Sequence, residues 1–154
     1  MNYNASTDAL VGDKLMVFVN DGTETLPIAF GTTCGINITA DTLDTSNKMS
    51  GNWKEYLVGQ LGYTVNSGSL MSMKEGQLSF KTLKKMMVNR VPLPFVMAKT
   101  IRTAEGDFTK DEEYVKGMGI ITSLEMSADN GSICTSSVTF QGTGELEDGD
   151  TGTP

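Results

Sequence analysis

The chain has 154 residues, of which 38% are apolar and 20% are charged, and its formal net charge is −7. This length fits one domain, and the composition excludes both a disordered polyelectrolyte and a membrane protein. The sequence contains no histidine, which excludes Ser-His-Asp and Cys-His nucleophile pairs, His-ligated zinc and therefore most hydrolytic enzymes.

The N-terminal half is expected to form strands separated by one long loop. Residues 1–13 are polar and aperiodic, without the apolar core of a secretory signal, and are interpreted as an N-terminal arm. Residues 41–52, DTLDTSNKMSGN, contain almost nothing to bury, so we expect a loop longer than an ordinary hairpin connection. Apolar runs and alternating patterns predict strands at 14–19, 26–30, 35–40 and 53–65.

One short helix is expected at about 79–89, where apolar residues recur at spacings of three and four. Ser79 is suited to the N-cap of this helix, and Pro92 prevents the helix from continuing. The patterns that follow predict strands at 95–101, 114–126 and 133–140.

The remaining segments are predicted to be connections. Residues 103–113 form a polar, acidic link, and Asp129-Asn130-Gly131 favours a tight turn between the last two strands. Residues 147–154 are expected to be a flexible C-terminal tail. The predicted fold is therefore mainly β, a β-sandwich or partial barrel flanked by one helix, with the domain spanning 14–146.

Candidate chemical sites are few. The acidic residues gather in two clusters, which are Asp107, Asp111, Glu112 and Glu113, and Glu145, Glu147, Asp148 and Asp150. Neither cluster has the spacing of an EF-hand, so a solvated acidic surface is favoured over a calcium site. The sequence also lacks phosphate-loop, dinucleotide-loop and nucleophile-elbow motifs. We therefore expect no catalytic residues, no cofactor and no metal, and the chain is predicted not to be an enzyme.

The two cysteines, Cys34 and Cys134, lie far apart in the sequence. A disulfide between them is unsupported, and two small buried apolar side chains are the favoured interpretation. No window approaches the roughly 18 apolar residues that span a bilayer, so no membrane partner is expected.

Charge is distributed unevenly along the chain. Residues 1–77 carry −4, residues 78–102 carry +6 and residues 103–154 carry −9. The basic segment contains few aromatic residues, which disfavours a nucleic-acid site. Two interpretations stay open: a solvated face, or pairing between copies of the chain. For such pairing the candidates are Lys81, Lys84, Lys85 and Arg90 against Asp107, Asp111, Glu112 and Glu113.

From about Lys14 to Leu146 the order of features resembles that of phage major tail tube proteins, chiefly those of long non-contractile tails. The resemblance begins with KLMVFV and IAFGTTCGINITADTLDTSNKMSGNWKEYLVGQLGYTVNSGSL. It continues through the single helix and ends with the strand SVTFQGTG, which is similar to the closing Ser-x-x-Phe-x-Gly-x-Gly strand of that family.

The resemblance implies that copies assemble into hexameric rings, which stack into the tail tube, and that their sheets merge into an inner β-barrel around each ring. The long loop at 41–52 would then reach the neighbouring ring. The residues expected to carry these stacking contacts are Asp41, Thr42, Asp44, Thr45, Ser46, Asn47, Lys48, Ser50, Gly51 and Trp53.

The implied partners are other copies of the chain, the tape-measure protein, and the tail terminator and distal tail proteins. Genomic DNA would pass through the lumen without specific binding. The implied location is the virion tail, after assembly in the host cytoplasm.

Size supports a multi-subunit channel independently of the resemblance. A compact domain of this length has a radius of gyration of about 15 Å, too small to enclose a channel for DNA alone. Two alternatives stay open. One is the tube subunit of a contractile tail or secretion device, and the other is a monomeric β-sandwich binding module.

Overall fold

The structure is a computed structural model that describes residues 15–20, 22–28, 31–71, 78–102 and 108–149. Within these residues, one seven-stranded antiparallel sheet has the strand order β2-β1-β5-β6-β7-β4-β3. The elements are β1 (Leu15–Asn20), β2 (Thr25–Pro27), β3 (Gly31–Asp44), β4 (Tyr56–Leu70), α2 (Phe80–Asn89), β5 (Leu93–Arg102), β6 (Phe108–Ser127) and β7 (Thr135–Asp148).

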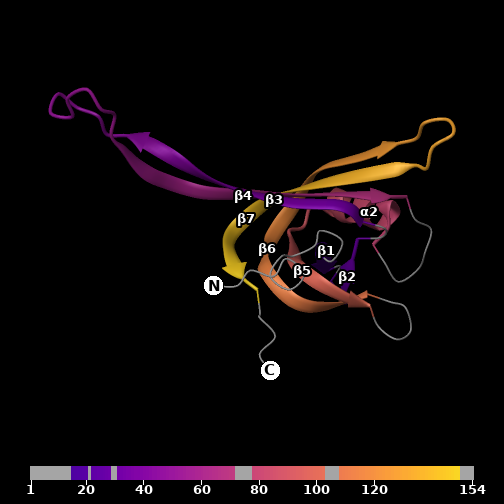
Figure 1. Ribbon diagram of the computed structural model, residues 1–154. Helices are drawn as coiled ribbons and strands as arrows, with labels where there is room; N and C mark the ends of the chain where they lie inside the picture. The colour runs from indigo at the N-terminus through magenta and orange to yellow at the C-terminus, as the bar shows by residue number, and fades with distance from the viewer. Residues whose placement is uncertain (1–14, 21, 29–30, 72–77, 103–107, 150–154) are drawn as a thin grey trace, which may run out of the picture.

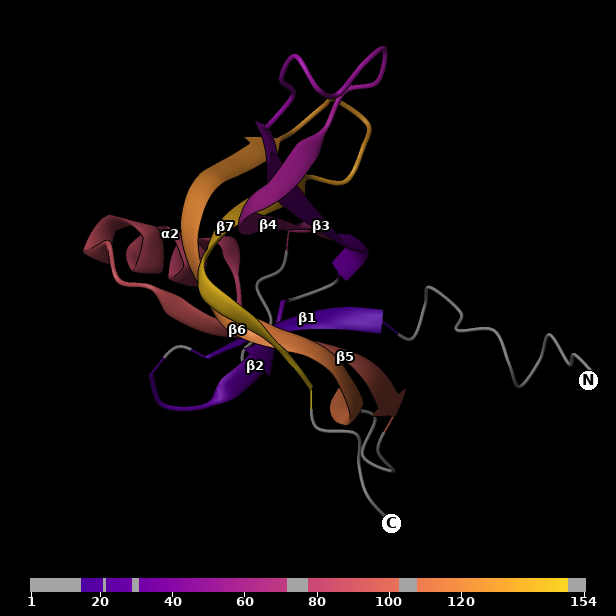
Figure 2. The same ribbon diagram turned by 90° about the vertical axis from the view of Figure 1, so that its left-hand side faces the viewer.

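The sheet turns back on itself along β6 and β7, so that β1 and β5 lie beneath β4 and β7 (Figures 1 and 2). The rings of Tyr63 on β4 and Phe95 on β5 lie 5.9 Å apart across the interior. The thiol of Cys34 on β3 donates a hydrogen bond to the Leu15 carbonyl oxygen on β1 at 3.3 Å. The predicted mainly β fold with one helix is confirmed, and its two layers belong to one continuous sheet that is not closed into a barrel.

The core lies between these two layers and is closed at one side by α2. In β4 and β7 alternate residues are buried, as expected for a sheet with one buried face, whereas β1 buries three consecutive residues, Val17, Phe18 and Val19. The buried apolar side chains include Val17, Val19, Tyr63, Val65, Phe95, Met97, Val138 and Phe140 from the strands, and Leu83 and Met86 from α2.

The helix is confirmed almost at its predicted bounds, but its capping differs. Ser79 occupies the N-cap position without a side-chain bond to the backbone, and its hydroxyl lies 3.3 Å from that of Thr82 instead. The helix ends at Arg90, which adopts a left-handed conformation with φ of 57° and donates its N–H to the Met87 carbonyl.

The long loop begins and ends later in the sequence than predicted, because β3 extends to Asp44 as one strand of a protruding two-stranded arm (Figure 1). Residues 41–44 belong to β3, and the connecting loop is 45–55, so the predicted bounds of 41–52 are wrong. Trp53 lies in this loop rather than in a strand. Polar residues occupy most of 41–44, so the composition of this segment did not indicate a strand.

The predicted turn at 129–131 is present between β6 and β7, but the loop around it is longer than that of a tight hairpin. Ser132 N–H does bond to the Asp129 carbonyl, and Gly131 has φ of 83°, but the strands end at Ser127 and Thr135. The Cys134 carbonyl accepts a hydrogen bond from the Met71 N–H, which holds the end of this loop beside β4 instead of β6.

Two further segments differ from the sequence predictions, and a third cannot be compared with them. The acidic link was expected to extend to 113, but β6 begins at Phe108 because this segment pairs with β5. β7 continues to Asp148, two residues into the predicted tail, where Glu147 lies 3.8 Å from Lys116. The predicted N-terminal arm at 1–13 lies outside the described residues.

Both cysteines are free, and only one of them is in the predicted environment. Cys34 is half-buried, and burial raises the pKa of its thiol. Cys134 is exposed in the β6–β7 loop, so the prediction that both are buried is wrong for Cys134.

Candidate assembly surfaces

The tip of the β3–β4 arm, residues 45–55, is held in one shape by its own hydrogen bonds. The Thr45 N–H donates to the Glu55 carbonyl at 2.9 Å, and the Glu55 N–H donates to the Ser46 hydroxyl at 2.8 Å. The Ser50 hydroxyl donates to the Glu55 carboxylate at 3.0 Å and accepts the Asn47 N–H at 3.0 Å. Short polar side chains form such local bonds well, which explains the composition of this segment.

Asp44 anchors the entry to this tip. Its carboxylate accepts the Ser46 N–H at 2.8 Å, and hydrogen bonding to Ser46 holds the pKa of Asp44 below its ordinary value. The bond stabilises the charged form of the carboxylate, and so the turn is fully stabilised near neutral pH and loses this contribution only in acid.

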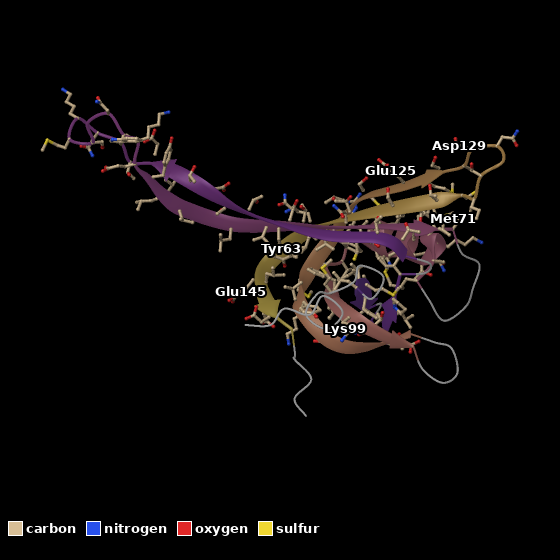
Figure 3. All side chains as sticks on the ribbon, in the orientation of Figure 1. Tyr63, Met71, Lys99, Glu125, Asp129 and Glu145 are labelled. Carbon is tan, nitrogen blue, oxygen red and sulfur yellow. The ribbon has the colours of Figure 1, made fainter. Side chains whose placement is uncertain are left out.

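The arm exposes an apolar stripe that continues the buried face of the sheet. Ile38 pairs with Tyr63, and beyond it Leu61 and Val58 lie on the same face, each 73% exposed. A bulge separates these two residues, where a Cβ on Gly59 would meet Asp41 at 3.2 Å. Figure 3 shows that the side chains of the arm stand clear of the rest of the chain. Exposed apolar surface of this kind is typical of an interaction site.

The tip adds two large exposed side chains, Met49 at 93% and Trp53 at 84%. The predicted stacking residues all lie on this arm: Asp41, Thr42 and Asp44 in β3, and Thr45, Ser46, Asn47, Lys48, Ser50, Gly51 and Trp53 in the tip. The structure thus brings them together on one protruding element, while their role in stacking stays a prediction.

A second surface is the solvent-facing side of α2. Lys81, Lys84 and Lys85 surround Val88, which is 68% exposed, and Arg90 follows at the end of the helix. These four cations form no ion pair with the residues that the structure describes. They form a basic surface with an apolar centre.

The structure describes only some of the acidic residues that were predicted to pair with this basic surface. Asp107 lies outside the described residues. Asp111 and Glu112 belong to β6, although their side chains lie outside the described part of the structure, and Glu113 is half-buried on β6 opposite Ala98.

A third surface is the face of β3, β4, β7 and β6 that points away from the core. Its described positions within 33–39, 64–68, 135–141 and 123–127 carry hydroxyl, amide and glycine residues, together with one carboxylate, Glu125. Those four segments contain no lysine or arginine. Figure 3 places Glu125 on the side of the sheet away from β1 and β5.

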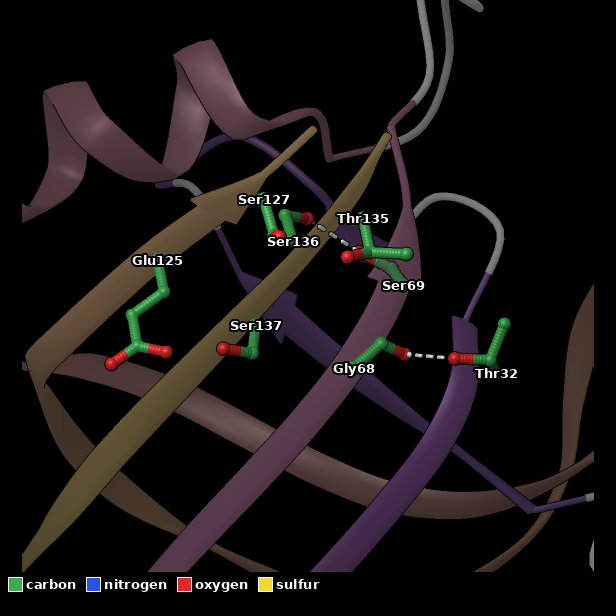
Figure 4. A pocket seen from close by; sticks show the side chains of 8 residues that line it. All are labelled: Thr32, Gly68, Ser69, Glu125, Ser127, Thr135, Ser136 and Ser137. Carbon is green, nitrogen blue, oxygen red and sulfur yellow. Dashed lines mark hydrogen bonds between the residues drawn. The ribbon is translucent and has the colours of Figure 1, made fainter. Parts of the chain in front are cut away.

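A shallow pocket of about 260 Å³ lies at one end of this face (Figure 4). It is lined by Thr32, Gly68, Ser69, Glu125, Ser127, Thr135, Ser136 and Ser137. The hydroxyls of Ser69 and Ser136 lie 2.8 Å apart, and that of Thr32 donates to the Gly68 carbonyl. The lining is therefore polar, with hydroxyl groups and one carboxylate, that of Glu125.

Both sides of this four-stranded face end in a free strand edge. β3 is the last strand of the sheet, and residues 120–127 of β6 extend beyond Gly119, the last residue that pairs with β5. In the described part of the chain no further strand pairs with either edge, although α2 lies against β6 and β1 contacts β3. Exposed edges are templates for pairing with another chain, and natural monomers usually blunt them.

The described residues contain no group of three or more His, Cys, Asp or Glu side chains placed to hold a metal ion. None of their helices is long and apolar enough to cross a bilayer.

The exposed apolar stripe on the arm is not predicted by the sequence pattern. Residues 53–65 were interpreted as an ordinary strand, because alternation looks the same whether the face is covered by its own core or by a neighbouring molecule.

Comparison with known proteins places these surfaces in context. No curated protein sequence gives a significant match. The solved structures that match include the C6-symmetric tail of an empty gene transfer agent particle, with a TM-score of 0.73 and 17% identity over 91% of this chain and 98% of that chain. The SPP1 tail tube matches with a TM-score of 0.69 and 16% identity over 93% of this chain and 81% of that chain.

The anti-feeding prophage baseplate matches as well, with a TM-score of 0.60 and 12% identity over 92% of this chain and 95% of that chain. At these identities the matches establish the fold. The family model described as phage tail tube protein matches residues 9–148, which is most of the sequence. The chain therefore belongs to the phage tail tube protein family and is a structural tube subunit.

Proposed function

We propose that the chain forms six-membered rings, which stack into a tail tube, and that the polar face of β3, β4, β7 and β6 lines the channel. One observation carries this proposal: the polar face of β3, β4, β7 and β6 is almost without charge, and an unpaired strand edge bounds it on each side. The C6 symmetry of the gene transfer agent tail supports the number of copies in a ring.

The free edges allow the sheets of neighbouring copies to join into the inner wall of the ring. If β3 of one copy lies beside the 120–127 segment of β6 in the next copy, four strands from each copy join into one barrel. A six-copy barrel of this kind has more strands than the roughly 16–18 that already leave an aqueous channel. Closure also removes the exposed edges that a single copy carries.

The composition of the wall suits passage of DNA. Lysine and arginine in the channel would bind phosphates and release counterions, so they would retard a moving duplex. This face offers DNA only neutral polar groups and the Glu125 carboxylate, which repels phosphate. We infer that genomic DNA passes without specific binding.

A stacked tube of this kind also has contacts with the next ring, with the tape-measure protein inside it and with the proteins at its two ends. The arms, with the residues predicted for stacking, reach the next ring, and the tube accommodates the tape-measure protein and ends at terminator and distal tail proteins. The protein acts in the virion tail after assembly in the host cytoplasm, and it has a geometric rather than an enzymatic role.

We favour a non-contractile tail, as the sequence resemblance implies. The match to the anti-feeding prophage baseplate means that the fold by itself does not separate this from the contractile or secretion-device alternative. A monomeric binding module is disfavoured, because it would leave the apolar stripe and both strand edges uncovered.

The channel assignment is tested by adding charge at Asn66, an exposed residue on this face. We expect Asn66→Lys tails to assemble but to release DNA more than about tenfold more slowly at low salt, with the defect shrinking as salt rises. Asn66→Asp is the matched control, and it should release DNA at the wild-type rate. Ejection kinetics of assembled particles provide the measurement, and equal rates for the two variants would contradict the assignment.

A further inference from the structure

We propose that the basic surface of α2 docks on an acidic surface at the end of β7 in a copy of the adjoining ring. This inference rests on the proposed stacking of rings, and it adds a contact in which the arm takes no part. We call the acceptor the acidic end, and it consists of Glu113 from β6 and Glu145, Glu147 and Asp148 from β7.

The charges on α2 do not stabilise the helix that carries them. Lys81, Lys84, Lys85 and Val88 lie on one face, at spacings of three and four, and residues 78–102 contain no aspartate or glutamate. Lys81 lies in the first turn, where the helix dipole favours a negative charge, and lysines at such spacings repel one another. None of the three lysines forms an ion pair with the described residues. The described fold therefore gives the basic surface no partner of opposite charge.

The fold assembles the acidic end from two acidic clusters that are distant in the sequence. Val115 on β6 pairs with Asp148 on β7, and a Cβ on Gly149 would overlap Glu113. The β7 carboxylates at this end are exposed to solvent. Residues 117–154 contain no lysine or arginine, so no cation of β7 offsets this negative charge.

The β7 carboxylates are available to a partner. Glu145 and Asp148 form no ion pair with the described residues. The Lys116 ammonium lies 3.8 Å from the Glu147 carboxylate. An exposed pair at this distance is weak, so Glu147 can accept a further ammonium group as well.

The acidic end is also held in place before docking. The Gly149 N–H donates to the Tyr114 carbonyl at 3.0 Å, which fixes the end of β7 to β6. Docking on groups that are already ordered costs little conformational entropy. Tyr114 is 38% exposed, and its ring provides apolar area for Val88 beside the carboxylates.

The positions of the two surfaces favour a second copy as the occupant. Figure 1 shows α2 at the end of the molecule opposite to the arm, and Figure 3 places Glu145 on the side that carries the arm. The two surfaces of one chain therefore do not meet. Two different complementary surfaces on one chain give a heterologous contact, which propagates from copy to copy.

The second copy belongs to the adjoining ring. The two free strand edges lie at the sides of the four-stranded polar face, and the proposed ring joins its copies there. α2 and the acidic end instead lie toward opposite ends of these strands, and both lie on the core side of the sheet (Figure 1). Stacking thus brings α2 of one ring to the acidic end of the next, outside the channel wall.

The test exchanges charges between the two surfaces in the full-length protein. Lys84→Glu with Lys85→Glu should leave single rings intact but raise the protein concentration needed for tube growth by more than about tenfold, because carboxylates then face carboxylates. Glu145→Lys with Asp148→Lys should raise it similarly, since cations then face cations. Combining all four substitutions should restore growth to within about threefold of the wild type, because the exchanged charges are complementary again.

Glu24→Lys with Asp129→Lys is the matched control for this rescue, because both residues are exposed loop carboxylates outside the acidic end. The control makes the same change in net charge, and it should not restore growth to the Lys84→Glu, Lys85→Glu protein. Electron microscopy of each variant over a range of protein concentrations counts the rings and the tubes.

Normal tubes from the Lys84→Glu, Lys85→Glu protein, or equal restoration by the control pair, would overturn the docking. Loss of single rings from that protein, with unchanged far-ultraviolet circular dichroism, would place α2 in the contact within a ring and would overturn it too. Rings without rescue by the fourfold exchange would overturn the docking alone. Wild-type protein that forms no rings would overturn the proposed function and the docking together.

Discussion

Gly142→Ala is expected to destabilise the domain by about 3 kcal/mol, the upper end of the usual range for overpacking in a core. A Cβ on Gly142 would overlap the ring of Tyr63, which lies directly over this glycine. The ring cannot withdraw, because its hydroxyl donates to the Met118 carbonyl at 2.9 Å and its other side faces Phe95.

The position of Tyr63 explains the size of this effect. The ladder between β6 and β7 is interrupted between Lys116 and Met118, and the phenol hydroxyl lies at this interruption, 3.4 Å from the Thr143 carbonyl. The same hydroxyl would lie 2.7 Å from a Cβ on Gly117. Small residues on two strands thus make room for one aromatic ring at the bend of the sheet.

Urea unfolding measures the effect of this substitution. Gly62→Ala is the matched control, because Gly62 lies on the same sheet and a Cβ there would approach nothing closer than the Thr39 hydroxyl at 3.8 Å. We expect the control to change the free energy of unfolding by less than about 1 kcal/mol. Equal stability of the two variants would show that the ring does not fix the bend.

Replacing the tip, residues 45–55, by Asn-Gly is expected to abolish tube growth without unfolding the domain. Asp44 pairs directly with Tyr56, so a two-residue turn can join β3 to β4 without changing their register. The hydrogen bonds of the tip lie within the tip or end at Asp44, so the core loses none of its hydrogen bonds.

Two measurements separate folding from assembly in this variant. Its free energy of unfolding should match that of the wild type to within about 1 kcal/mol. Electron microscopy should show rings but a more than about tenfold loss of tubes, because the exposed Trp53 and Met49 are gone. Full-length tubes from this variant would refute the stacking role that the sequence resemblance assigns to the segment.

Periodicity predicted the elements that pack against the core. The α2 helix was located to within one residue, because its apolar spacing reports burial of Leu83 and Met86 directly. The β1 strand was located for the same reason. Burial is the physical quantity that such patterns encode, so the elements with a buried face are the ones that a sequence indicates well.

The arm was predicted less well, because neither its polar segment nor its apolar stripe is buried within the chain's own fold. Residues 41–44 form a strand through backbone pairing alone, and their side chains give no signal of it. The apolar stripe gave a signal, but the pattern does not say whether the covering surface belongs to the same chain. The functional surface therefore has the appearance of ordinary core in the sequence.

For the polar face, the sequence indicates which residues point away from the core but not which strands are neighbours. Its residues alternate with core residues along four strands, so the sequence could show that they point away from the core. It could not show that the four strands are adjacent, or that β6 runs past the end of its pairing with β5 at Gly119. Both facts depend on long-range pairing, which no local pattern contains.

The most direct test of the central claim is an electron cryomicroscopy cross-section of tubes assembled from the purified protein. We predict six copies in each ring, with Asn66, Thr139 and Glu125 facing the channel and α2 on the outer side. A channel lined by α2, or protein that stays monomeric under all assembly conditions, would contradict it.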